Sequence, residues 1–273
     1  MLPKLWLSPT AQKIAEDFDG DPEQGIRHLV RQALTRSKVK GPPYFPDLIA
    51  GSCGVTDIRP MDIKQHGLLI KNGDGLKIYV NRRYPIRSDQ WNAICAHELG
   101  HALLLQYRGR DHPRSSIWTK EEEHLCDLAG RELLLPMRMF RSLITPDDGF
   151  SIESLTRLVG IFRTPPRMTA IRLVETGLWK SLVMQWTPLA RAPEHLGLAW
   201  WHSRVQIPAP PLRRGLAPAA LFGETNRIDR AWREKTPTLG LEQLTSGRAW
   251  WFVQSGPFED SALPCVISLV RLE

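Results

Sequence analysis

The most informative segment of this 273-residue chain is Trp91–Tyr107, WNAICAHELGHALLLQY, which contains HELGH at positions 97–101. Its apolar residues, at positions 91, 94, 95, 99, 102 and 103, follow helical spacing, and Ser88 before them is a plausible N-cap. On a helix, His97 and His101 lie one turn apart, so both imidazoles project from one face. Two neutral imidazoles at this separation suit a zinc ion.

Glu98 lies about 100° round this helix from His97 and about 60° from His101, taking 3.6 residues per turn. It is therefore placed beside a metal ion without ligating it, where a general base for a metal-bound water is needed. Gly100 costs the helix about 1 kcal/mol relative to alanine, which a close neighbour that tolerates no side chain would explain. The alternative is a helix with two surface histidines and a glutamate, which the apolar residues on its other faces disfavour.

A catalytic zinc site takes three protein ligands and leaves one position open. The pattern HExxHxxGxxH would supply a third histidine, but Leu104 and Tyr107 occupy its glycine and histidine positions and exclude it. The remaining source is a carboxylate on a later helix. Residues 119–136, TKEEEHLCDLAGRELLLP, offer three adjacent glutamates at a predicted helix start.

Thr119 and Glu122 form a capping box, which assigns Glu122 to the helix start, and Glu121 suits the positive end of the helix dipole. Glu123 is then the predicted third ligand, with Glu122 as its main rival. Asp127, one turn further along the same face, would accept a hydrogen bond from the distal N–H of a ligating histidine. The alternative makes all three glutamates a solvated helix N-terminus.

Helices and one hairpin are expected around this segment. Helical spacing occurs twice within residues 9–37, and residues 41–60, rich in proline and glycine, are predicted to connect elements. HGLLIK and LKIYVN within 66–81, joined by NGDG, predict a hairpin. A helix should run from about 119 to 135, and two short helices should occupy 151–177.

The composition changes near residue 180, which marks a second domain. The later part holds short β-like runs and six of the ten tryptophans: Trp186, Trp200, Trp201, Trp232, Trp250 and Trp251. Because adjacent residues of a strand face opposite sides, the two members of a Trp-Trp pair cannot both enter one core layer. A sheet covered on both faces is one interpretation, and a ligand pocket or dimer surface is the other.

The composition, 42% hydrophobic and 24% charged, is ordinary for a globular protein. Four scattered cysteines without a CxxC or CxxH pair exclude a disulfide scaffold and a zinc ribbon, and they predict a cytoplasmic location. No run approaches 18 apolar residues, and the N-terminus lacks the apolar stretch of a signal peptide, so we expect no membrane segment.

The net charge of +7 is a weak indication of a nucleic-acid or acidic partner. Residues 1–136 contribute +2, from 19 basic and 17 acidic residues, and residues 137–273 contribute +5, from 17 and 12. Most of the excess therefore lies outside the segment that carries the motif.

These motifs resemble the ImmA/IrrE family of bacterial metallopeptidases, in which HELGH is followed by E-x-E-A-N-x-F-A-x-x-L-L-x-P. Counting back from Pro136 places the first family glutamate on Glu123 and the family asparagine on Asp127. The resemblance covers residues 60–177. The chain departs from the pattern at five positions, none of them a predicted ligand: Leu125, Cys126, Asp127, Ala129 and Gly130.

The resemblance implies an α+β fold in three parts. A zincin-like metallopeptidase core, with a small sheet and the active-site helices, would occupy 1–146, and a helical segment resembling a helix-turn-helix would occupy 147–180. A mixed α/β domain at 181–273 would follow, which in some relatives is a GAF-like sensor. The implied function is a zinc endopeptidase that cleaves a helix-turn-helix repressor and so derepresses stress-response or mobile-element genes.

A zinc ion held by these three ligands is expected to activate water and to polarise a peptide carbonyl. Glu98 would move a proton from the water to the leaving amine. The strand at 76–81 is expected to pair with an extended substrate. Tyr107, His112 and His124 are candidates for the donor that the oxyanion needs.

The rival function is a DNA-binding or signal-sensing regulator whose zinc site is structural or silent. Arg163, Arg167 and Arg172 flank or lie on the second short helix, where a recognition helix would be. The alternative is a helix pair that packs over the peptidase and leaves its arginines solvated. Glu98 favours catalysis, because a purely structural zinc needs no base. The sequence does not indicate an oligomeric state.

Overall fold

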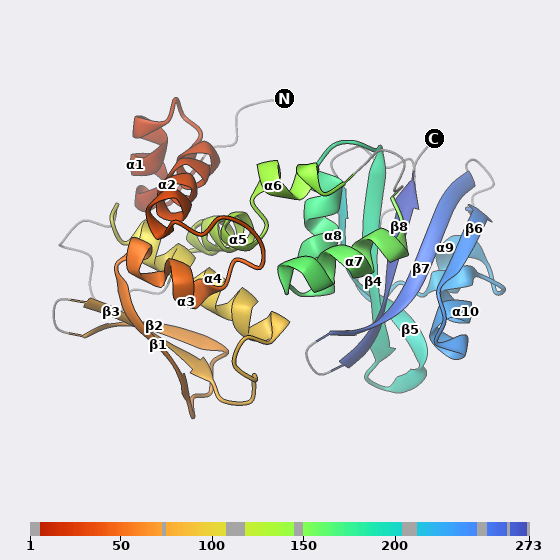
Figure 1. Ribbon diagram of the computed structural model, residues 1–273. Helices are drawn as coiled ribbons and strands as arrows, with labels where there is room; N and C mark the ends of the chain where they lie inside the picture. The colour runs from red at the N-terminus through yellow and green to blue at the C-terminus, as the bar shows by residue number, and fades with distance from the viewer. Residues whose placement is uncertain are drawn as a thin grey trace. The chain divides into compact units, whose positions relative to one another are not determined.

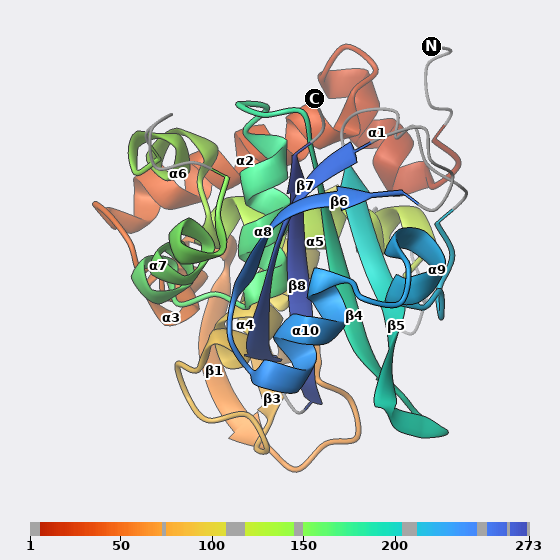
Figure 2. The ribbon, with the colours of Figure 1, turned by 90° about the vertical axis from the view of Figure 1, so that its right-hand side faces the viewer.

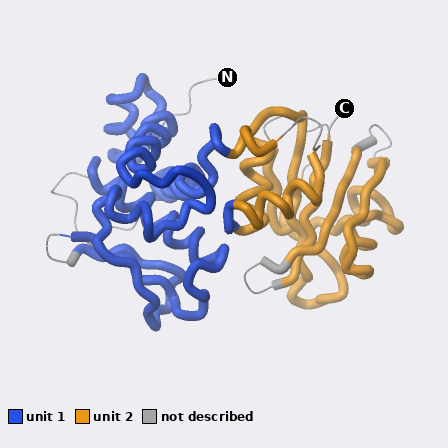
Figure 3. Tube along the Cα trace, viewed as in Figure 1, with its two compact units in different colours: residues 1–139, 162–164 blue, residues 140–161, 165–273 orange. Residues whose placement is uncertain are grey.

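The computed structural model describes residues 6–72, 75–107, 118–144, 150–203, 212–244, 250–260 and 263–271. They form helices and small sheets, so the chain has the mixed α+β fold that the sequence predicted (Figure 1). Two compact units are distinguished: Met1–Met139 with Phe162–Thr164, and Phe140–Ile161 with Pro165–Glu273 (Figure 3). Among the described residues, no helix is long and apolar enough to cross a membrane.

The first unit surrounds a small sheet with helices. Its elements are α1 (Pro9–Asp17), α2 (Pro22–Ser37), α3 (Pro46–Ile49), the 3-10 turn η1 (Ala50–Cys53), β1 (Val55–Met61), β2 (Gly67–Asn72), β3 (Gly75–Asn81), α4 (Asp89–Leu104) and α5 (Lys120–Leu134). Proline opens α1 and α2, and the side chains of Ser8 and Asp21 cap their first turns. Helix α6 (Met137–Ser142) follows and runs across the division in the chain.

The sheet of this unit has the strand order β1-β3-β2, so β3 is central. β2 and β3 pair antiparallel, which confirms the predicted hairpin, and β1 pairs parallel with β3. The prediction of a connector over 41–60 is wrong for 46–53, which forms α3 and η1, and for 55–60, which belongs to β1. VTDIRP lies at a sheet edge and is largely exposed, so its apolar alternation is weak and Pro60 is tolerated.

Helix α4 packs against β2 and β3, where Ile78 and Val80 are fully buried. Its start agrees with the sequence, since the Ser88 hydroxyl accepts a hydrogen bond from the Trp91 N–H at 3.2 Å. The central residues of α4 therefore lie against the edge strand β2.

Helices α4 and α5 approach closely because a glycine on each faces the other helix. A Cβ on Gly100 would lie 2.8 Å from the carbonyl oxygen of Cys126, and one on Gly130 would lie 3.1 Å from the backbone nitrogen of His97. These contacts are the close neighbours that Gly100 suggested. They bring the backbone of α5 directly against the motif.

The second unit is built on a five-stranded antiparallel sheet of order β5-β4-β8-β7-β6. Its elements are α7 (Ile152–Phe162), α8 (Pro166–Glu175), β4 (Ser181–Leu189), β5 (Ala192–Ser203), α9 (Pro218–Phe222), α10 (Arg227–Glu234), β6 (Thr238–Gln243), β7 (Trp250–Asp260) and β8 (Leu263–Arg271). Helix α10 covers one face of the sheet (Figure 2), where side chains of α9 and α10 join an apolar core with Leu182, Trp186 and Val253. Helix α8 contacts β4, β5, β7 and β8.

The adjacent tryptophans of β5 face opposite sides of this sheet. Trp201 packs against the core under α9 and α10, whereas the Arg167 guanidinium of α8 lies over the ring of Trp200 at 4.7 Å. Both faces are therefore covered at this pair, as the first interpretation had it. Trp250 and Trp251 lie in β7, but their side chains are outside the described residues.

The division of the chain differs from the three expected parts, 1–146, 147–180 and 181–273. Helix α8 and nearly all of α7 are grouped with the C-terminal sheet, while Phe162–Thr164, at the end of α7 and after it, is grouped with the first unit. The physical reason is packing: α8 buries Ala170, Leu173 and Val174, and the Ile152 N–H donates a 3.0 Å hydrogen bond to Gln254 of β7.

Candidate metal centre

Helix α4 contributes His97, Glu98 and His101. Their ligand atoms lie within 4.8 Å of one another. The two imidazole rings meet edge to face, with centroids 4.7 Å apart, and His101 is the more buried of the two, with 6% of its side chain exposed against 28% for His97. One turn of α4 therefore presents two histidine rings to the same volume.

Helix α5 contributes the carboxylate that approaches both histidines. Glu123 Oε2 lies 3.2 Å from Nε2 of His97 and 3.8 Å from Nε2 of His101. Glu122 is used at the helix start instead: its Oε2 accepts the Thr119 N–H at 2.8 Å, and its own N–H is bonded to Thr119 Oγ1 at 3.2 Å. The capping box thus separates the predicted ligand from its rival.

Asp127 lies beside the opposite nitrogen of His97. Its Oδ1 is 2.9 Å from Nδ1, so the imidazole lies between two carboxylates of α5. Burial opposes a charged imidazole, but the hydrogen bonds with Asp127 and Glu123 outweigh it and raise the pKa of His97 to about 10. Burial raises the pKa of Asp127, and the stronger effect of His97 lowers it below its ordinary value.

Glu98 is 7% exposed and points toward the edge strand. Burial raises the pKa of its carboxyl to about 7, against the lowering effects of His97 and of a hydrogen bond with the Leu69 backbone. A Cβ on Gly67 of β2 would lie 2.7 Å from Glu98 Oε1. Glu98 therefore lies close to both imidazoles while its carboxylate is held by β2, which distinguishes it from Glu123.

His101, the more buried histidine, has two neighbours that the sequence did not predict. Cys126 Sγ lies 3.0 Å from Nδ1 of His101, and the Trp118 ring lies 4.3 Å from the His101 ring, centroid to centroid. Burial raises the pKa of the Cys126 thiol well above its ordinary value, which keeps it protonated. These two residues and Gly67 were not predicted, because the periodicity of one helix does not show which residues of a second element lie next to it.

The oxyanion donors suggested by the sequence are not brought to this site by any contact seen among the described residues. The Nε2 atom of His124 lies 3.0 Å from Glu23 Oε1 of α2. Tyr107 follows α4, and its pKa is raised by burial and by the charge of Asp17. His112 lies outside the described residues.

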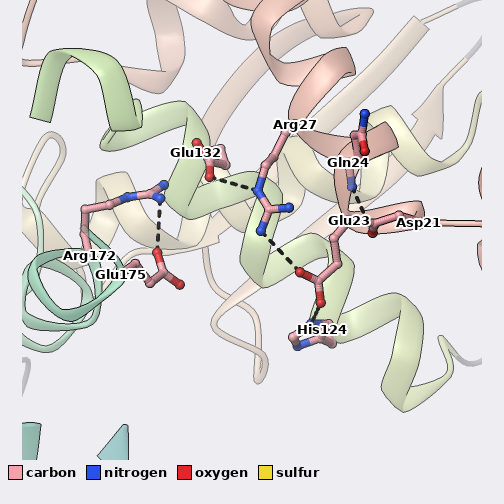
Figure 4. A network of polar contacts seen from close by, with 8 residues as sticks. All are labelled: Asp21, Glu23, Gln24, Arg27, His124, Glu132, Arg172 and Glu175. Atoms are coloured by element: carbon pink, nitrogen blue, oxygen red, sulfur yellow. Dashed lines mark hydrogen bonds and ion pairs between the residues drawn. The ribbon is translucent and has the colours of Figure 1, made fainter. Parts of the chain in front are cut away.

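A polar network holds α2 on α5, the helix that carries Glu123 (Figure 4). The Arg27 guanidinium lies between Glu23 at 3.2 Å and Glu132 at 3.5 Å, and Glu23 also meets His124. The hydrogen bond with His124 lowers the pKa of Glu23 to about 2, more than burial raises it. The ion pairs thus fix α5 from the side away from the imidazoles.

The strand expected to pair with a substrate, 76–81, corresponds to β3, and that expectation is wrong. β3 is central and bonded on one side to β1 and on the other to β2. The edge next to Glu98 belongs to β2. Pairing order is set by the third strand, β1, which the sequence did not reveal.

The three arginines that suggested a recognition helix all contact other residues of the protein. Arg163 Nε bonds Asp89 at 3.2 Å, Arg167 lies over Trp200, and the buried Arg172 pairs with Glu175 at 3.0 Å. A recognition helix needs an exposed face of such side chains. Of the two that lie on α8, Arg167 is exposed and Arg172 is buried.

Comparison with known proteins gives a likeness to solved structures. Neither the comparison with protein-family models nor the search of curated proteins finds a match. A solved structure described as a Mycobacterium tuberculosis transcriptional regulator resembles this chain with a TM-score of 0.58 at 11% sequence identity, over 96% of this chain and 94% of that one. At this identity the likeness is one of fold.

Proposed function

We propose that this chain is a zinc-dependent endopeptidase with a zincin-like core. The observation that carries the proposal is the approach of Glu123 Oε2 to both histidine Nε2 atoms, at 3.2 and 3.8 Å, beside the buried Glu98. With zinc–ligand bonds of about 2.0–2.1 Å and tetrahedral angles, ligand atoms lie about 3.3 Å apart. Two histidines and a glutamate are a ligand set of zinc peptidases.

Zinc held by His97, His101 and Glu123 would polarise a peptide carbonyl and make water acidic enough to attack at neutral pH. Glu98 takes the proton of the attacking water and passes it to the leaving amine. In the metal-free protein burial raises the pKa of this carboxyl to about 7, and the best acid–base catalysts titrate near the working pH. Asp127 accepts the Nδ1 proton of His97 and so fixes the orientation of that ring.

The substrate backbone would align along β2. This strand ends the sheet, so among the described strands its outer side has no partner. An extended peptide that adds to this edge, as in β-strand addition, would pass over Glu98, because Gly67 contacts that carboxylate. The scissile bond would then lie between Glu98 and the zinc ligands.

The substrate class follows from the resemblance to the ImmA/IrrE peptidases, which points to a helix-turn-helix repressor of stress-response or mobile-element genes. The cytoplasmic location proposed with it agrees with the four cysteines, all of them buried thiols in the structure.

The test is metal analysis followed by cleavage of a helix-turn-helix repressor encoded beside this protein, with the products identified by mass spectrometry. We expect about one zinc per chain. Glu98→Gln should retain zinc and lose about 10²–10⁴-fold in cleavage rate. Glu123→Gln should lose zinc, whereas the matched variant Glu121→Gln, on the same helix turn, should keep it because Glu121 bonds the Leu7 and Ser8 N–H groups instead. Unchanged cleavage in Glu98→Gln would contradict the mechanism.

A second candidate function is a signal-sensing or DNA-binding regulator with a non-catalytic zinc site. It is favoured by the fold neighbour described as a transcriptional regulator. One zinc per chain without cleavage of any repressor, together with DNA binding that survives Glu98→Gln, would support this candidate over the peptidase.

A further inference from the structure

The two imidazoles of the proposed metal site need the same tautomer, and α5 provides a different partner for each. A histidine that binds zinc through Nε2 must carry its proton on Nδ1. Nδ1 of His97 meets the Asp127 carboxylate at 2.9 Å, whereas Nδ1 of His101 meets the sulfur of Cys126 at 3.0 Å. The two partners are consecutive residues of one helix.

The placement of the Cys126 sulfur is fixed by the backbone. A Cβ on Gly100 would lie 2.8 Å from the Cys126 carbonyl oxygen and 2.9 Å from its Cα, so α4 leaves the cysteine no room to shift. Cys126 itself is fully buried. The His101 ring, on the other side of this contact, is restrained as well, because the Trp118 ring packs on it.

The proposed metal site requires one direction of the hydrogen bond between Cys126 and His101. Nε2 of His101 is the atom turned toward Glu123 Oε2, at 3.8 Å, and toward the His97 side of the site. An S–H donated to Nδ1 would leave the proton on Nε2 and block metal binding. An Nδ1–H donated to the sulfur leaves the Nε2 lone pair free.

We propose that Cys126 is a positioning residue whose sulfur accepts the Nδ1–H of His101 and holds this ring in the tautomer that binds zinc through Nε2. The proposal rests on the metal site of the proposed function. It makes Cys126 the counterpart of Asp127, with a neutral sulfur on the buried histidine and a carboxylate on the more exposed one.

The experiment compares zinc affinity, by chelator competition, in the wild type and three variants of the full chain. Cys126→Ala should weaken zinc binding about 10–100-fold, as loss of such a partner does. Cys126→Ser keeps an acceptor and should stay within about threefold of the wild type. Cys53→Ala, which removes another buried thiol of the same unit, should bind zinc like the wild type.

A second measurement needs no variant. In the cobalt-substituted wild type, each ligand Nδ1–H gives a shifted, exchangeable proton NMR signal. Slow exchange of the His101 signal is expected, because the proton is held by a buried sulfur. Rapid exchange of this proton, or wild-type zinc affinity in Cys126→Ala, overturns the role of Cys126 alone. A wild type that binds neither metal overturns the metal site itself.

Discussion

At the scale of single residues, Glu98 lies in an environment unlike that of an exposed carboxylate. It is buried on a helix that lies against a sheet, and burial raises its pKa from 4.5 to about 7. Such a group destabilises the folded state wherever it must ionise, which is a common feature of catalytic carboxylates. The catalytic role proposed for Glu98 and the stability of the fold therefore place opposite demands on this residue.

The zinc-free protein should reveal this conflict through Glu98→Gln. Because the pKa of Glu98 is higher in the folded state than in the unfolded state, the folded protein loses stability as the pH rises from about 4.5 to 7 and Glu98 ionises. The amide avoids this cost, so the variant should be more stable than the wild type at pH 8, by up to about 3 kcal/mol. Below pH 4.5 the advantage should vanish. Thermal unfolding in a chelating buffer at pH 8 and pH 4.5 measures it, and an advantage independent of pH would contradict this assignment.

Glu23 shows the opposite dependence of stability on pH. Its pKa is lowered from 4.5 to about 2 by the hydrogen bond with His124. The hydrogen bond between Glu23 of α2 and His124 of α5 therefore stabilises the fold fully above pH 4.5, and this stability is lost as the pH falls toward 2. Glu23→Gln should cost about 1 kcal/mol at pH 6, since a partly exposed pair is screened, and less at pH 3.5. Urea unfolding at both pH values tests this, with Glu16→Gln, an exposed carboxylate of α1, as the control.

At the scale of elements, the contact of α4 with α5 sets the site. Gly100→Ala would place a methyl 2.8 Å from the Cys126 carbonyl oxygen and push the helices apart. We expect a loss of about 1–3 kcal/mol in unfolding free energy together with weaker zinc binding, because Glu123 moves with α5. Calorimetry and chelator competition measure the two effects.

The control for this change is Gly160→Ala on α7. Nothing lies within 4 Å of a Cβ built at Gly160, so helix propensity should stabilise that variant by up to about 1 kcal/mol. If both alanines stabilised the protein, the two helices would not be in the close contact described.

At the scale of the whole molecule, the grouping of α8 with the C-terminal sheet has a direct test. A chain cut after residue 180 loses the strands on which Ala170, Leu173 and Val174 pack. We expect this fragment to expose apolar surface, bind a hydrophobic dye and aggregate on size-exclusion chromatography. A monomeric 1–180 fragment that unfolds cooperatively would show instead that α7 and α8 do not need the sheet.

The sequence predicted those elements whose pattern is local. Ser88 and the capping box of Thr119 with Glu122 mark helix starts, and the hairpin of β2 and β3 has its own turn signal. β1 was missed because parallel pairing with β3 is non-local and its exposed residues carry no period. β6 has no such local signal, since its TLGLEQ carries a glycine and exposes Leu239 and Leu241.

The same limit applies to the proposed metal site. The capping box was enough to separate Glu123 from Glu122, because Thr119 and Glu122 are neighbours at the start of one helix. The contacts of Cys126, Trp118 and Gly67 cross between elements. Their distances depend on how closely α4 meets α5 and β2, which a single sequence does not specify.

The start of α5 carries one further consequence. Between Glu121 and Asp127, nearly every side chain meets a different part of the first unit: the N-terminal segment, the cap, the imidazoles or α2. Inserting or deleting one residue here would turn all of them by about 100° and shift them by about 1.5 Å together. These contacts together therefore allow the helix a single rotation and register.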